Sequence, residues 1–171
     1  MRKLRYNVAM TLDGFIADPN GGYDWIIMDP AIDFAALFSE FDTFVMGRKT
    51  FDVSAQTEFM SMFGGKDVIV FSRTVKASPH PGIRFVDTDP VATVRALKSK
   101  AGKDIWLFGG GETFRTLADA GLVDTVEVAV MPVLLAEGLP VLPAGGRITG
   151  MKLTSCEALP NSGIVMMRYA L

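Results

Sequence analysis

Residues 104–114 read DIWLFGGGETF: an apolar run ends at three consecutive glycines, and a segment with helical character follows. Each glycine costs about 0.5–1 kcal/mol of conformational entropy relative to alanine. The run therefore indicates either a backbone conformation closed to other residues or a surface that must carry no side chains. A strand that ends in glycine before a helix is typical of anion binding, because free N–H groups face the ligand. Taken alone, the run also fits a tight turn that packs a helix against a strand.

The composition is that of one ordered domain. The chain has 171 residues, of which 49% are apolar and 21% charged, so we expect a single domain over residues 1–171. A net charge of −2 argues against a nucleic-acid partner. The single cysteine, Cys156, excludes an internal disulfide and indicates no metal site. No signal peptide and no apolar run of membrane-spanning length is apparent, so we expect a cytoplasmic protein without a membrane partner.

Short apolar runs alternate with helical patterns along the chain. Strands are expected at residues 5–10, 43–46, 68–71, 83–86, 104–108, 125–131, 151–158 and 164–170. Helices are expected at residues 30–41, 49–55, 91–101 and 112–120, with Asp29 as N-cap and Pro30 opening the first. This alternation predicts an α/β fold with a mostly parallel sheet. The last three strands have no helices between them, which favours antiparallel pairing at the end.

Two further strand ends carry groups suited to phosphate. Residues 43–50 read TFVMGRKT and residues 68–74 read VIVFSRT. Arg48 and Arg73 are planar donors that match phosphate geometry, and ligands of open α/β sheets bind outside the carboxyl ends of strands. The usual fingerprint G-x-G-x-x-G is broken by Phe114, and the loop G-x-x-x-x-G-K-[ST] is absent. Three such strand ends together nevertheless predict a site for a phosphorylated dinucleotide.

Four segments in order resemble the dihydrofolate reductase-like family, which includes the reductase domain of bacterial riboflavin biosynthesis. They are MTLDGFIAD, FVMGRKTFD, VIVFSRT and LFGGGETF, and the resemblance covers nearly the whole chain. It implies a dihydrofolate reductase-like three-layer α/β/α fold, with a mostly parallel eight-stranded sheet and antiparallel C-terminal strands. It also implies a cis peptide between Gly109 and Gly110, and NADPH as cofactor.

The resemblance implies roles for residues around the cofactor. Arg48, Ser72 and Arg73 would hold the 2′-phosphate, Ile16 and Ala17 would line the nicotinamide, and Gly111 would allow close approach to the pyrophosphate. The full set of expected NADPH contacts is Ala9, Ile16, Ala17, Gly47, Arg48, Lys49, Thr50, Ser72, Arg73, Thr74, Phe108, Gly109, Gly110, Gly111, Glu112 and Thr113.

The substrate side needs one buried carboxylate that grips a heterocycle and assists protonation of a C=N bond. We expect Asp33 to be this catalytic residue, because in the predicted helix it shares a face with Leu37 and Phe41. The alternative is an acid that merely favours the helix N-terminus. Trp25, Phe34, Leu37 and Lys66 are the expected substrate-binding residues. Asp13 precedes Gly14 and more often marks a turn.

These patterns predict an NADPH-dependent reductase that transfers hydride to a pterin-like or related heterocycle, with a small-molecule substrate. They leave the oligomeric state open, with a homodimer among the alternatives. Lys66 stands where folate enzymes carry an arginine for the glutamate tail, and lysine cannot form the same forked pair. The stretch VMPVLLAEGLPVLP is closer to the riboflavin-type branch, whereas MGRKTFDVSA departs from that branch's G-x-G-T-V-x-x-D-[DN]-P segment. A 5-amino-6-(5-phosphoribosylamino)uracil reductase, an NADPH-binding protein without turnover and a purely structural module therefore remain alternatives.

Overall fold

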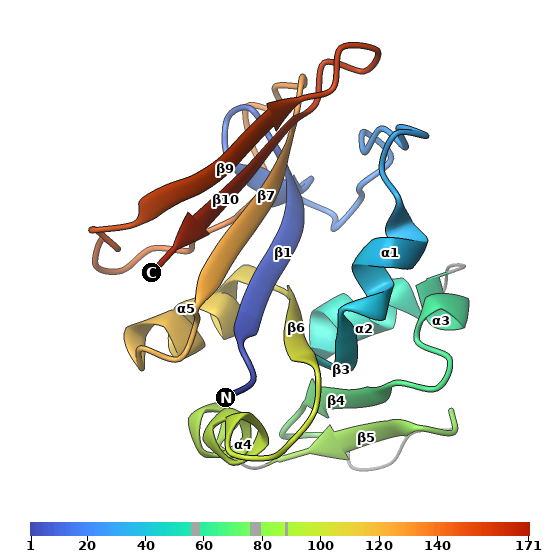
Figure 1. The fold of residues 1–171 in the computed structure, drawn as a ribbon, viewed down its shortest axis with the longest axis vertical. Coiled ribbons are helices and arrows are strands. Elements are labelled where there is room, and N and C mark those ends of the chain that lie inside the picture. The colour runs from blue at the N-terminus through green and yellow to red at the C-terminus, as the bar shows by residue number, and fades with distance from the viewer. Residues whose placement is uncertain (56–58, 76–79, 88) are drawn as a thin grey trace.

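The computed structural model describes residues 1–55, 59–75, 80–87 and 89–171, which form one large sheet flanked by helices (Figure 1). The eight strands of the sheet run in the order β5-β4-β3-β6-β1-β7-β10-β9. Their bounds are β1 (Leu4–Thr11), β3 (Phe41–Gly47), β4 (Asp67–Phe71), β5 (Ile83–Val86), β6 (Asp104–Gly109), β7 (Thr125–Met131), β9 (Lys152–Ala158) and β10 (Val165–Ala170). The pairs from β5 to β7 are parallel, and β10 is antiparallel to both β7 and β9. The predicted sheet is confirmed.

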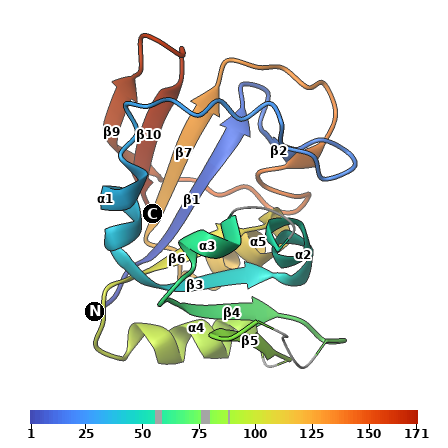
Figure 2. The ribbon, with the colours of Figure 1, turned by 90° about the vertical axis from the view of Figure 1, so that its right-hand side faces the viewer.

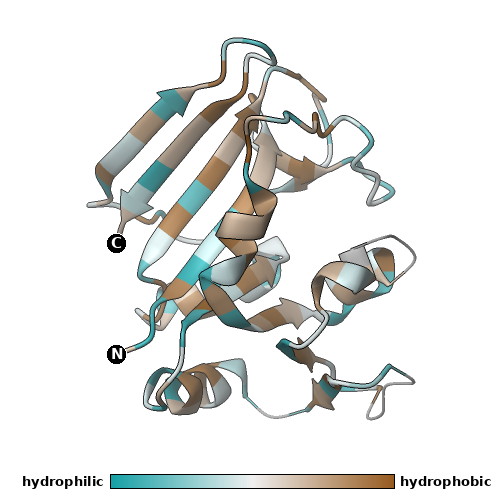
Figure 3. Cartoon of the chain, turned by 45° about the vertical axis from the view of Figure 1, so that its right-hand side comes forward, coloured by the Kyte–Doolittle hydropathy of each residue, from teal (hydrophilic) through white to brown (hydrophobic). Residues whose placement is uncertain are grey.

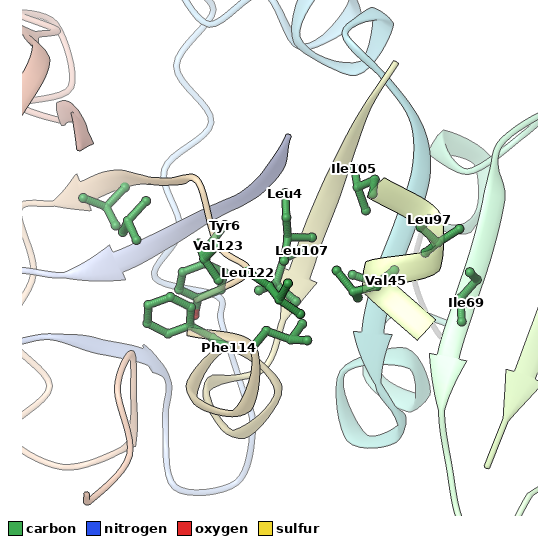
Figure 4. Packing of buried hydrophobic residues seen from close by; sticks show 14 of the residues in the cluster. Leu4, Tyr6, Val45, Ile69, Leu97, Ile105, Leu107, Phe114, Leu122 and Val123 are labelled. Atoms are coloured by element: carbon green, nitrogen blue, oxygen red, sulfur yellow. The ribbon is translucent and has the colours of Figure 1, made fainter. Parts of the chain in front are cut away.

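Helices cover both faces of the sheet, which confirms the predicted three layers. They are α1 (Phe34–Ser39), α2 (Arg48–Ser54), α3 (Phe59–Met62), α4 (Pro90–Lys98) and α5 (Gly111–Asp119). On one face, Leu97 of α4 and Phe114 of α5 pack on the sheet, and Phe114 stacks on Tyr6 with ring centroids 4.1 Å apart (Figure 4). On the other face, Phe38 of α1 and Phe51 of α2 belong to a second, largely aromatic core.

The strand sequences explain this double coverage. Along β6, Ile105 and Leu107 face the first core, whereas Trp106 and Phe108 face the second. A strand covered on both faces therefore reads as a continuous apolar run. The C-terminal strands instead mix polar and apolar residues (Figure 3), and every residue of the edge strand β9 is exposed.

The first expected helix was wrong in its bounds. The helix is α1, and its N-cap is Asp33, whose carboxylate accepts a hydrogen bond from the Ala36 N–H at 2.9 Å. Asp29 caps only a turn, where its carboxylate accepts from the Ala31 N–H at 2.8 Å. Two capping signals lie four residues apart, and the second starts the helix. Phe41 begins β3 with a fully buried side chain, so the sheet core ends the helix early.

Three short elements were not expected. Besides α3, the strands β2 (Phe15–Ala17) and β8 (Leu139–Pro140) form a small antiparallel sheet of their own. Strands of two or three residues are too short to give a periodic pattern. Among the described residues, no helix is long and apolar enough to cross a membrane.

Candidate functional site

The sheet divides where β1 and β6 part. The two strands pair only from Leu4↔Ile105 to Tyr6↔Leu107, although β1 continues to Thr11 and β6 to Gly109. Figure 2 shows β1 and β7 rising away from β3 and β4 beyond this point. The chain leaves β1 and later enters β3 on the far side of β6. In open α/β sheets such a switch in strand order is where ligands bind.

Two helices begin at this edge without a side-chain cap. The N-cap of α2 is Gly47 and that of α5 is Gly110, and neither helix receives a capping hydrogen bond from a side chain. By contrast, α1 is capped by Asp33 and α4 by Asp89. Because β3 and β6 are neighbours with Met46 opposite Gly109, both uncapped ends lie at the same edge. Their free N–H groups can bind an anion there.

The glycines at these helix ends are tightly surrounded. A Cβ on Gly47 would stand 2.8 Å from Thr113 Oγ1, and one on Gly110 would stand 3.2 Å from Thr50 Oγ1. The peptide between Gly109 and Gly110 is cis, as the family resemblance implied, and Gly109 has a φ of 135°, which favours glycine. These positions form a narrow cradle that additional side chains would fill.

A side chain at Gly111 would clash with another segment of the chain, which the sequence did not indicate. A Cβ there would stand 2.8 Å from the carbonyl oxygen of Pro140 and 2.9 Å from Cδ of Pro143. The chain's own β8 segment therefore makes the close approach at Gly111. Contact of Gly111 with a pyrophosphate stays a prediction.

The expected 2′-phosphate residues come from neighbouring strand ends. Gly47 lies opposite Phe71 in the ladder between β3 and β4, so Arg48 and Ser72 follow side by side. The Arg48 Nε donates to both carboxylate oxygens of Asp52 at 2.6 Å. Ser72 is buried, and its hydroxyl oxygen accepts from the Val75 N–H at 2.9 Å. The remaining expected cofactor residues along this edge are Arg73, Lys49, Thr74 and Glu112, which are exposed, and Phe108, whose side chain packs into the aromatic core.

Near this division of the sheet, two loops are joined by hydrogen bonds. β2, which carries Ile16 and Ala17, pairs with β8, and Ala9 lies on the adjacent β1. The Asp13 carboxylate accepts hydrogen bonds from the Thr11 hydroxyl at 2.6 Å, the Leu135 N–H at 3.0 Å and the Ala136 N–H at 2.8 Å. The bond from Thr11 and these backbone bonds lower the pKa of Asp13. Asp13 thus fastens the loop after β1 to the loop after β7.

A cavity of about 260 Å³ lies on the α1 side of the sheet. It is lined by Asn7, Ala31, Ile32, Leu37, Glu127, Val128, Ser155, Glu157, Leu159, Met166, Met167 and Arg168. Of the expected substrate residues, the cavity lining includes Leu37. Sequence reasoning missed Asn7, Glu127 and Arg168. Their signal was a polar residue inside an otherwise apolar strand, as in TVEVAV and VMMRYA.

Glu127, in the wall of this cavity, is the centre of a buried polar network. Arg5 forms a forked pair with it, Nε to Oε1 at 2.7 Å and Nη2 to Oε2 at 2.8 Å. Thr125, Asn7 and Arg168 each donate one more hydrogen bond to its carboxylate. Burial by itself would raise the pKa of Glu127, but the bonds from Arg5 and Thr125 outweigh it and lower the pKa. Glu127 is therefore an ionised structural acceptor.

The other expected substrate residues lie elsewhere. Asp33 is exposed at the N-terminus of α1, so the expectation that it is buried was wrong, while its catalytic role stays a prediction. Trp25 packs beside Met131 and Leu159, and Phe34 is half-buried on α1.

The ammonium group of Lys66 is hydrogen-bonded to main-chain carbonyl oxygens. Its Nζ donates to the carbonyl oxygens of Phe38 at 3.0 Å and Phe41 at 2.7 Å. Lys66 therefore links the end of α1 to the start of β3. Binding of a substrate by Lys66 stays a prediction.

Comparison with known proteins gives a consistent picture. The family model of the RibD C-terminal domain matches residues 2–165. The uncharacterized protein YyaP of Bacillus subtilis is 34% identical over 179 residues, covering 98% of this chain and 94% of that protein. The "Putative riboflavin biosynthesis protein" of Shewanella sp. PV-4 superposes with a TM-score of 0.81 at 26% identity, covering 99% of this chain and 98% of that one. The dihydrofolate reductase of Enterococcus faecalis, solved with NADP(H) and the ligand RAB-propyl, superposes with a TM-score of 0.73 at 18% identity, covering 98% and 95%.

Proposed function

The chain belongs to the RibD C-terminal domain family, and we propose that it is an NADPH-dependent reductase that transfers hydride to a C=N bond of a nitrogen heterocycle. The observation that carries this proposal is the uncapped N-terminus of α5 after Gly110, which opens onto the glycine cradle formed with Gly47, Thr50 and Thr113. Free backbone N–H groups at a helix start beside glycines suit a phosphate group.

The residues at this edge of the sheet fit this cofactor. Thr50 stands over Gly110, and a Cβ on Gly110 would fill the space between them. The N–H groups after Gly47 and Gly110 would hold the pyrophosphate, while Arg48, Ser72 and Arg73 would hold the 2′-phosphate. When bound, NADPH supplies the hydride, and the substrate nitrogen takes a proton, so that C=N becomes CH–NH. The Enterococcus faecalis enzyme of the same fold was solved with NADP(H), which supports the choice of cofactor.

The state of Lys66 favours a pyrimidine of the riboflavin pathway over dihydrofolate. Its ammonium group is engaged by the carbonyl oxygens of Phe38 and Phe41. A glutamate tail would have to break these bonds to reach it, and lysine could not replace the forked pair that arginine makes. We therefore offer 5-amino-6-(5-phosphoribosylamino)uracil reduction as the second candidate function.

The test is equilibrium binding followed by turnover. NADPH should bind more tightly than NADH, and Arg73→Ala should weaken NADPH about tenfold while leaving NADH unchanged, because a charge-assisted bond contributes about 1.5–3 kcal/mol. Arg84→Ala is the control, since Arg84 is an exposed arginine paired with Asp67 on β4. NADPH oxidation is then measured with dihydrofolate and with the riboflavin-pathway pyrimidine. Equal affinities for NADPH and NADH would refute the cofactor assignment, and binding without oxidation of either substrate would favour a sensor.

A further inference from the structure

One wall of the cavity presents a hydrogen-bond donor beside an acceptor, and both are oriented by the buried Glu127. Arg168 Nη2 donates to Glu127 Oε2 at 3.1 Å, and Asn7 Nδ2 donates to the same oxygen at 3.2 Å. Arg168 comes from β10 and Asn7 from β1, and β7 with Glu127 lies between these strands. One carboxylate oxygen therefore fixes two side chains of the cavity wall.

The hydrogen bond to Glu127 also fixes which way the Asn7 amide is turned. An amide oxygen facing a carboxylate would be repelled, so Nδ2 faces Glu127 and Oδ1 faces away from it. Among the described residues, the guanidinium of Arg168 makes the one hydrogen bond to Glu127, and four of its five N–H groups remain for a ligand. The wall thus offers N–H donors from Arg168 and a carbonyl acceptor from Asn7.

Glu127 cannot serve as the ligand's partner. Arg5 donates to it twice, and Thr125, Asn7 and Arg168 donate once each. A carboxylate has about four lone-pair sites, so these bonds saturate it. Glu127 is a positioning residue: it orients the side chains of Asn7 and Arg168, which would contact the ligand.

We propose that the cavity recognises its substrate through a cyclic amide edge, –CO–NH–, whose carbonyl oxygen accepts from Arg168 and whose N–H donates to Asn7 Oδ1. Ile32, Leu37 and Met166 line the same cavity and would pack on the faces of a flat ring. The proposal rests on the proposed function and deepens it, because it states which heterocycles the reductase accepts. An analogue with an amino group in place of the carbonyl would set donors against the donors of Arg168.

Two probes isolate this edge: pterin, which carries the cyclic amide, and 2,4-diaminopteridine, which has an amino group at the same ring carbon. Their binding is titrated by ligand fluorescence, with and without NADPH. Wild type should bind pterin at least about tenfold more tightly, because a site built for a hydrogen-bonding group rejects an analogue that leaves it unpaired. Arg168→Met and Asn7→Leu should each abolish this preference. Arg84→Met, far from the cavity, should keep it.

Several outcomes would overturn the proposal. One is a wild-type protein that binds 2,4-diaminopteridine more tightly than pterin. If Glu157→Gln then lost this reversed preference, recognition would be assigned to Glu157, the other carboxylate of the cavity lining. Another is a pterin preference that survives Arg168→Met. The wild-type comparison needs no variant, so a poorly folded mutant does not block the test. Failure of the proposed function is seen separately, because NADPH binding is measured by itself and the probes are also titrated without NADPH.

Discussion

Gly47 and Thr113 hold the first turns of α2 and α5 against each other: a Cβ on Gly47 would stand 2.8 Å from the Thr113 hydroxyl oxygen. The two residues belong to different strand–helix units, which meet because β3 and β6 are neighbours. The contact sets how closely the two uncapped helix ends approach. The space between them is therefore fixed by a glycine on one side and a hydroxyl on the other.

Substitution of Gly47 should strain this contact and a second substitution should relieve it. Gly47→Ala is expected to lower the free energy of unfolding by about 1–3 kcal/mol, the usual cost of overpacking. Thr113→Ala removes the clashing hydroxyl, so the double variant should recover most of that loss. Urea denaturation of the four proteins in the cycle measures the coupling. Additive effects would show that the two helix ends do not touch in solution.

Gly110→Ala is expected to act on the cofactor more than on the fold. The new Cβ would stand 3.2 Å from Thr50 Oγ1, in the space where the N–H groups of α5 open. We expect NADPH affinity to fall about tenfold or more, with a change in Tm of only a few degrees. Gly146→Ala is the matched control, because its Cβ would stand 3.4 Å from the end of the Arg115 side chain. Full NADPH affinity in Gly110→Ala would mean that the glycine run is only a turn.

The sequence predicted the sheet well because its signals were local. Runs such as VIVF and IWLF need burial on both faces, and the glycines after them mark strand ends. The antiparallel end of the sheet followed from the absence of helices after residue 125. The cis peptide after Gly109 followed from the family resemblance, since no local pattern encodes it.

The cavity was not predicted because its partners are distant in sequence. Arg5 and Glu127 are 122 positions apart, and either one alone reads as a charge at a strand edge. Only the pairing register of β1 and β7, which sets Asn7 opposite Glu127, brings Arg5 and Glu127 into one buried network. Similarly, Asp29 and Pro30 predicted a helix start four residues before Asp33, which caps α1 in the structure. The burial of Phe41 in the sheet core explains only why that helix ends early.

Asp13 should make stability depend on pH at the acidic end. Its bonds to Thr11, Leu135 and Ala136 lower its pKa in the folded state, so the unfolded chain binds the proton more readily. The stabilisation is present above the unfolded-state pKa of about 3.9 and is lost as the pH falls through the lower folded-state value. Urea denaturation between about pH 2 and pH 6 should show a shallower pH dependence for Asp13→Asn than for wild type. If the free energies of unfolding of wild type and Asp13→Asn depended equally on pH, the Asp13 carboxylate would not make these hydrogen bonds in solution.

Glu127→Gln should be strongly destabilising, because it leaves Arg5 buried without its forked partner. Removal of one member of a buried pair costs about 3–5 kcal/mol, which chemical denaturation would detect. The side chains of Arg5 and Glu127 are only 6% and 7% exposed, so solvent cannot replace the lost bonds. In Glu127→Gln the buried Arg5 keeps only its ion pairs with Glu40 and Asp104. The double variant Arg5→Met, Glu127→Leu should be more stable than Glu127→Gln, since it removes the buried guanidinium together with its forked partner. A Glu127→Gln protein as stable as wild type would contradict the network.

Asp33 can be assigned as a cap, a catalytic acid or both by two substitutions. Asparagine caps a helix about as well as aspartate, whereas alanine costs about 1 kcal/mol. If Asp33 only receives the Ala36 N–H, Asp33→Asn should match wild type in stability and turnover, and Asp33→Ala should lose stability alone.

If Asp33 also assists protonation of the substrate, as we predict, Asp33→Asn should keep the fold and NADPH affinity while turnover falls about 10²–10⁴-fold. The deficit should shrink as the pH is lowered, because protonated substrate no longer needs the carboxylate. The exposed position of Asp33 makes this comparison clean, since neither substitution disturbs the core. Wild-type turnover in Asp33→Asn would move the proton-transfer role to a group at the cavity itself, where Glu157 is the carboxylate to examine next.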